Sequence, residues 1–86
     1  MRREDEQQLL IRLFKRFHFK TIELKYGYLK SASEDLAEIS SRLFCKELDL
    51  NPNILKLFGV MNTFKKDQGL SFVVYLQLMA IFYLKK

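Results

Sequence analysis

The sequence predicts an all-α fold, built as a compact four-helix domain. Three observations support this prediction. The chain is 49% hydrophobic, so it can build a core. It has only three Gly and one Pro, which leaves few breaks between elements. Apolar residues also recur at helical spacing along most of the 86 residues. A chain of this length is expected to form a single helical domain, residues 1–86.

The first predicted helix covers residues 3–19. Its apolar residues fall at i, i+1, i+4, i+5 and i+8 and share one face, and they are Leu9, Leu10, Leu13, Phe14 and Phe17. Acidic residues at 4–6 suit the positive end of the helix dipole. The opposite side is basic and consists of Arg12, Lys15, Arg16 and Lys20.

The stretch 21–28 is ambiguous in the sequence. Ile22, Leu24, Tyr26 and Tyr28 alternate with more polar residues, which is strand spacing. An isolated strand needs a mate, and the region 69–72 could supply one in a minimal two-stranded ribbon. Strand, loop and helix all remain open here, because the next helix could also start near Tyr26.

Two further helices are predicted in the middle of the chain. The first covers residues 34–48, with Ser31 and Glu34 as a capping box and Ser33 as a rival cap. The second opens at Asn51 and Pro52, a cap residue followed by proline at the first helical position. It is expected to continue to residues 65–66.

The last predicted helix, residues 72–84, is apolar on every side except at Gln77. The segment 67–69 is expected to form a turn, and Ser71 to cap this helix. A domain this small buries only roughly 60% of the surface of its unfolded chain, so a partner is the natural cover for such a helix. The predicted partner-binding residues are Phe72, Tyr75, Leu76, Met79, Phe82 and Tyr83. The alternative is that this helix is simply central to the bundle.

The composition also bears on location and on the membrane. The single Cys45 cannot form an internal disulfide, and the N-terminus lacks the apolar run of a signal peptide. We therefore expect an intracellular protein, cytoplasmic or nuclear. As a helix, residues 72–84 would rise about 20 Å, whereas the hydrocarbon core is about 30 Å thick, so no membrane span is expected.

The residues do not predict an enzyme. His18 and Cys45 are single, and a Cys–His dyad is the one nucleophilic arrangement that they could form. Cys45 lies within a helix stripe, where a buried thiol is expected, and His18 lies at the end of a basic helix. One His and one Cys do not make a zinc site, and no glycine-rich phosphate loop occurs. We expect no cofactor and no metal.

The segment 62–79 resembles the second loop and exiting helix of an EF-hand. Leu70 stands at the central hydrophobic position of the loop, and Tyr75 at the aromatic that begins the exiting helix. Upstream, residues 21–30 look like the first loop of the small dimeric EF-hand proteins of the calgranulin and calcyclin type, with Leu24 as the loop hydrophobe. The resemblance implies an EF-hand-pair-like domain and a dimer.

The same loop departs from the family at its calcium ligands. A calcium loop supplies oxygens from positions 1, 3, 5, 7 and 9 and a bidentate Glu at position 12. With Leu70 at position 8, Lys65 stands where an oxygen is needed and Val74 where the acid is needed. The sequence therefore predicts no calcium site, even within this fold.

A rival resemblance involves the AraC-type regulators. Residues 64–76 are similar to their second helix-turn-helix, and residues 35–37 to the start of their first one. The spacing between the two segments is too long for that family. Residues 77–84 also contain no basic side chain to reach base edges.

Two functions follow from these patterns. The first is a calcium-independent protein–protein interaction module, or a small subunit of an assembly, which docks through its apolar last helix as an oligomer or on another protein. The alternative is a small nucleic-acid-binding or transcription-regulatory protein that uses Arg12, Lys15, Arg16 and Lys20 on a chain of net charge +5.

Overall fold

The computed structural model describes residues 3–27 and 34–84, and within them the all-α prediction is confirmed. The elements in chain order are α1 (Arg3–Tyr26), α2 (Leu36–Glu47), α3 (Asn53–Leu57), the short 3₁₀ helix η1 (Met61–Thr63) and α4 (Phe72–Phe82). The described residues contain no strand beyond one isolated antiparallel bridge, between Lys65 and Gly69.

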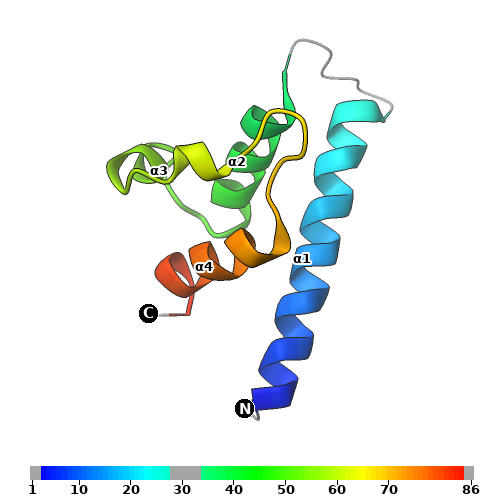
Figure 1. Ribbon diagram of the computed structural model, residues 1–86, viewed down its shortest axis with the longest axis vertical. Helices are drawn as coiled ribbons and strands as arrows, with labels where there is room; N and C mark the ends of the chain where they lie inside the picture. The colour runs from blue at the N-terminus through cyan, green and yellow to red at the C-terminus, as the bar shows by residue number, and fades with distance from the viewer. Residues whose placement is uncertain (1–2, 28–33, 85–86) are drawn as a thin grey trace.

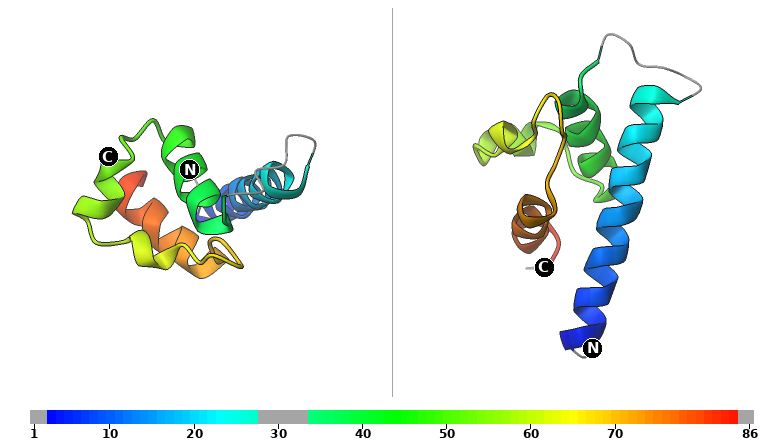
Figure 2. Two further views of the ribbon diagram at one scale, coloured as in Figure 1. Left: turned by 90° about the horizontal axis from the view of Figure 1, so that it is seen from above. Right: turned by 45° about the vertical axis from the view of Figure 1, so that its right-hand side comes forward.

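The longest helix, α1, stands along one side of the molecule, and the other helices gather beside its second half (Figure 1). Figure 2 shows the same separation from above. There α2, α3 and α4 form one group and α1 lies to one side. The first turns of α1 extend past α4 without a neighbouring helix. The core therefore forms between this group and the part of α1 from Leu10 onward.

The ambiguous stretch continues α1 as far as Tyr26, so the predicted helix end at residue 19 and the strand reading are both wrong. Thr21 is buried at helical spacing from Phe17, and its Oγ1 donates a hydrogen bond to the Phe17 carbonyl (2.9 Å). A polar residue thus occupies a buried position, while the apolar Tyr26 is exposed. The alternation of residue types concealed the helical period. Leu24 consequently lies in a helix, and Tyr28 lies outside the described residues.

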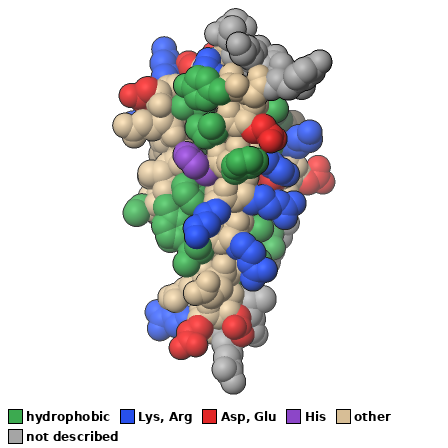
Figure 3. All heavy atoms as spheres, turned by 90° about the vertical axis from the view of Figure 1, so that its right-hand side faces the viewer, with side chains coloured by type: hydrophobic (Ala, Val, Ile, Leu, Met, Phe, Trp, Pro, Cys, Tyr) green, Lys and Arg blue, Asp and Glu red, His purple; other side chains and the backbone are tan. Residues whose placement is uncertain are grey.

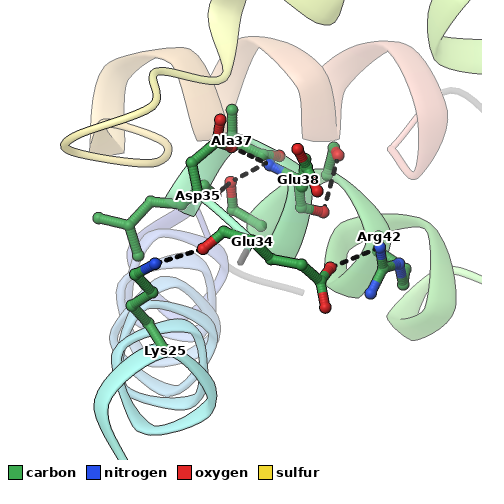
Figure 4. A network of polar contacts seen from close by, with 9 residues as sticks. Lys25, Glu34, Asp35, Ala37, Glu38 and Arg42 are labelled. Atoms are coloured by element: carbon green, nitrogen blue, oxygen red, sulfur yellow. Dashed lines mark hydrogen bonds and ion pairs between the residues drawn. The ribbon is translucent and has the colours of Figure 1, made fainter. Parts of the chain in front are cut away.

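The start of α2 is capped by Asp35, whose Oδ1 accepts a hydrogen bond from the Glu38 amide (2.9 Å). The predicted caps, Ser31 and Ser33, lie outside the described residues. Figure 4 shows how the neighbouring Glu34 ties this end of α2 to α1. The Lys25 ammonium of α1 donates to the Glu34 carbonyl, and the Glu34 carboxylate pairs with Arg42 at 2.6 Å.

The predicted third helix, 51–66, is interrupted because the chain adopts a left-handed conformation at Gly59 (φ +67°). The Val60 amide donates to the Leu55 carbonyl and the Gly59 amide to the Lys56 carbonyl, both at 3.0 Å. These two bonds form a Schellman motif, which satisfies the last carbonyls and ends α3.

Helix α2 ends in the same way, although its left-handed residue is not a glycine. Asp49 has φ +55°, the Leu50 amide donates to the Cys45 carbonyl (2.8 Å), and the Asp49 amide to the Lys46 carbonyl (3.3 Å). Asp tolerates this region better than most residues, but a Cβ there still costs conformational energy.

The centre of the core is an aromatic cluster around the buried ring of Phe44 in α2. Four rings surround it at centroid distances of 6.0–6.3 Å and steep interplanar angles: Phe17 from α1, Phe64 after η1, and Tyr75 and Phe82 from α4. Edge-to-face pairs in this distance range are favourable beyond their area burial. One side chain of α2 therefore connects the elements that form the core.

Replacing Phe44 with Ala is expected to lower the free energy of unfolding by about 3–5 kcal/mol, because it leaves a cavity in contact with four rings. This loss is a large share of the total free energy of unfolding of a small domain, which is typically about 5–15 kcal/mol. Phe44→Leu keeps most of the volume and should cost less. Urea unfolding followed by circular dichroism measures both, and equal losses for the two variants would contradict the central role of this ring.

Asp49→Gly should raise the free energy of unfolding by about 0.5–1 kcal/mol, because glycine adopts positive φ without the Cβ penalty. The matched change, Gly59→Ala, should lower it by about 1–2 kcal/mol. A Cβ at Gly59 would meet no atom within 4 Å, so its effect reports backbone strain alone. Thermal and urea unfolding test the pair, and effects of the same sign would refute this account.

Candidate docking surface on the last helix

Helix α4 buries one of its faces in the core. Ser71 caps its start as predicted, since Ser71 Oγ accepts a hydrogen bond from the Val74 amide (3.3 Å). Tyr75, Leu78, Met79 and Phe82 are buried, and their spacing of three and four residues places them on one side of the helix.

The opposite face of α4 is apolar and open to solvent. Val73 is 64% exposed and Ile81 and Leu84 are each 41% exposed. Val73, Gln77 and Ile81 fall at i, i+4 and i+8 of the helix and form one stripe, and Leu84 lies just beyond the last helical residue, Phe82. These four residues are hereafter the α4 outer face. No charged residue occurs from Ser71 to Leu84. The helix therefore combines a covered apolar face with an uncovered one.

The predicted partner-binding residues are divided between three environments. Tyr75, Met79 and Phe82 belong to the core, so the chain's own packing covers them. The prediction that these three residues form part of a docking surface is therefore corrected. A uniformly hydrophobic helix does not reveal from its sequence which side faces inward.

Phe72 and Leu76, by contrast, line a cavity between α4 and the first half of α1. The other lining residues are Gln7, Leu10 and Ile11, and its volume is about 240 Å³. Phe72 also contacts the ring of Phe14 at a centroid distance of 5.1 Å. These two predicted residues thus lie beside the α4 outer face, at the junction with α1.

Tyr83 is partly exposed and borders a separate hollow between α1 and the end of α2. Arg16 and Glu47 line the same hollow, with Tyr75 and Met79. This residue therefore faces polar neighbours as well as apolar ones.

Sequence reasoning missed Val73, Ile81 and Leu84. Their helical spacing was present, but the equally apolar residues between them concealed it. It also missed Phe58, which is exposed although its ring lies 5.0 Å from that of Phe82. Phe58 therefore adds apolar surface near the end of α4.

The basic residues predicted on the first helix do not all share one environment. Arg12, Lys15 and Arg16 are exposed on α1. Lys20 is turned toward α2, where its Nζ lies 3.5 Å from a carboxylate oxygen of Glu47. Three of the four predicted cations are therefore available on one surface.

Cys45 and His18, the two residues that could form a catalytic dyad, lie in different surroundings. Cys45 is buried, and burial raises the pKa of its thiol, which disfavours the reactive thiolate. His18 is exposed and stacks on Phe14 at 5.7 Å. Across residues 3–27 and 34–84 there is no group of three or more His, Cys, Asp or Glu that could hold a metal ion. In the same part of the chain, no helix has both the length and the apolar character to cross a membrane.

Comparisons with protein-family models, with curated proteins and with solved structures found no match to this chain. The EF-hand and AraC-type resemblances therefore remain predictions.

Burial raises the pKa of Tyr75 to about 12, and the charges of Glu47 and Tyr83 add to the effect. In the unfolded chain a tyrosine ionises near pH ~10. Between these values the unfolded state holds fewer protons than the folded state, so the free energy of unfolding should fall as pH rises through this window.

The variant Tyr75→Phe should lose this part of the alkaline decline, since phenylalanine does not ionise. Urea unfolding at several pH values between about 9 and 12, a range that includes both pKa values, measures how the free energy of unfolding changes with pH. Tyr26→Phe, on the exposed side of α1, is the control and should leave the slope unchanged. Identical slopes for all three proteins would contradict the burial of the Tyr75 hydroxyl.

Proposed function

We propose that this chain is a non-catalytic protein–protein interaction module that docks through the α4 outer face, independently of calcium. The observation that carries the proposal is that α4 is apolar on every side except at Gln77, while its own chain covers only one side. Val73 and Ile81, on the outer side of the helix, and Leu84, just beyond its end, are 41–64% exposed. Contiguous apolar surface of this kind marks interaction sites more often than isolated exposed residues do.

The chemistry of the surface indicates an apolar protein partner. Burying exposed apolar area contributes roughly 25 cal/mol per Å², so covering this stripe is favourable. A charged ligand would find no complementary group on it, because residues 71–84 carry no charge. The exposed ring of Phe58 lies near the end of α4 and the half-buried ring of Phe72 lies at its start, and aromatic side chains are enriched at interaction hot spots.

The occupant that these features favour is a second copy of the chain. The chain carries a net charge of +5, yet the α4 outer face is neutral. Two such faces can therefore meet about a twofold axis without bringing like charges into contact. An isologous contact of this kind is the commonest form of small oligomer. A permanent subunit of a larger assembly would use the same face against a different chain.

Lysine at two positions of this face tests the proposal. Val73→Lys with Ile81→Lys should weaken self-association at least about tenfold, because it places two charges inside an apolar contact. The fold should persist, since both side chains are exposed in the monomer. Sedimentation equilibrium gives the association constant, and circular dichroism checks the fold.

The control is Gln68→Lys, which adds a charge in the exposed turn before α4 and should leave association unchanged. A wild-type chain that stays monomeric at sub-millimolar concentration would overturn docking between copies. Equal association constants for the double-lysine variant and the wild type would show that another surface is used.

A further inference from the structure

A second surface lies on α1 and combines cations with exposed aromatic rings. Its members fall at i, i+3, i+4, i+7 and i+14 on the solvent side of the helix, hereafter the α1 stripe: Arg12, Lys15, Arg16, Phe19 and Tyr26. Phe19 is 66% exposed and Tyr26 is 64% exposed. Figure 3, which looks onto this side of the molecule, shows Lys and Arg side chains beside hydrophobic ones over the middle of the helix.

The rings of the α1 stripe are not needed by the core. The buried positions of α1 are Phe17 and Thr21, which lie on the opposite side of the helix. Phe19 thus faces water about one turn beyond Lys15 and Arg16, and Tyr26 faces water about two turns further along the same side of the helix. A merely solvated helix face needs charges but has no use for exposed rings.

We propose that the α1 stripe binds single-stranded nucleic acid. Arg12, Lys15 and Arg16 contact phosphates, and the rings of Phe19 and Tyr26 stack on unpaired bases. Proteins that bind single strands combine a positive surface along the backbone with aromatic platforms for successive bases. The α1 stripe lies on a different helix from the α4 outer face, and binding there does not depend on docking at α4.

The aromatic residues favour a single strand over a duplex. In a duplex the base faces are stacked on one another, so exposed rings on a helix surface gain nothing from it. Cations alone would not distinguish the two, because both carry phosphates.

The same residues argue against a membrane surface. A helix that lies in a bilayer interface places its rings and its cations on opposite faces, so that the apolar face can insert. Here Phe19 stands between Arg16 and Tyr26 on one face, and the apolar face of α1 is occupied by the core.

The structure also sets the limits of the site. From residue 12 to residue 26 the helix rises about 21 Å, which corresponds to about six stacked nucleotides at 3.4 Å each. Lys20 is not included, because it pairs with Glu47. Glu23 is exposed one turn after Phe19, and its carboxylate opposes a phosphate backbone. Removing the charge of Glu23 should therefore strengthen binding, whereas removing a cation should weaken it.

The experiment is a salt-titrated anisotropy assay with a labelled single-stranded RNA or DNA of mixed sequence. Phe19→Ala and Tyr26→Ala should each weaken binding at least about fivefold, the lower bound for loss of one stacked base. Arg12→Ala with Arg16→Ala should lower the slope of log K against log salt by about 1.4, since each phosphate contact contributes about 0.7 for single strands. Glu23→Gln should tighten binding.

The matched control is Lys56→Ala, which removes one exposed cation from α3 and should weaken binding less than Phe19→Ala does. Circular dichroism should be unchanged for all variants, because every mutated side chain is exposed. Undetectable binding to single strands at low salt would overturn the proposal. It would equally be overturned by equal affinity of Phe19→Ala and wild type, by preference for a hairpin duplex, or by binding to anionic vesicles alone.

Discussion

The fold depends on the contact of Phe44 with four other aromatic rings. The neighbouring rings come from three separate segments of the chain: Phe17 is in α1, Phe64 follows η1, and Tyr75 and Phe82 are both in α4. Short helices depend on packing of this kind to persist. Helix α3, for example, has only five residues and could not persist without packing. The position of α4 against α2 thus follows from the need to enclose one ring.

This constraint explains why α4 has two different faces. The helix must present Tyr75 and Phe82 to Phe44, which turns Val73 and Ile81 outward. The apolar residues on the outer side contribute nothing to that enclosure. Their presence is the feature that the proposed docking function explains and that packing within one chain does not.

Much of the helix content could be predicted from the sequence because its signals were local. Ser71 caps α4, Asn51 accepts a hydrogen bond from the Asn53 amide (2.9 Å) at the start of α3, and Cys45 is buried in a helix stripe. Each of these depends on a residue type and its immediate neighbours. The helical stripe that contains Phe44 was also visible in the sequence, but the position of its ring at the centre of the cluster was not.

The features that sequence reasoning missed depend on tertiary context. Thr21 is buried because its hydroxyl bonds within the helix, so its polarity misled the assignment of residues 21–26. Gly59 could equally have continued the helix, but it adopts the left-handed conformation that ends α3. The outer face of α4 could not be separated from its inner face, since both are apolar. The α1 stripe was found only in part, because Phe19 and Tyr26 were not recognised as exposed.

The arrangement of the core also affects how the protein is made. Translation proceeds from the N-terminus, so α1, α2 and α3 leave the ribosome before α4. Until α4 follows, the ring of Phe44 lacks two of its four neighbours, and the apolar sides of α1 and α2 remain open to water. The nascent chain therefore exposes these apolar surfaces until late in synthesis.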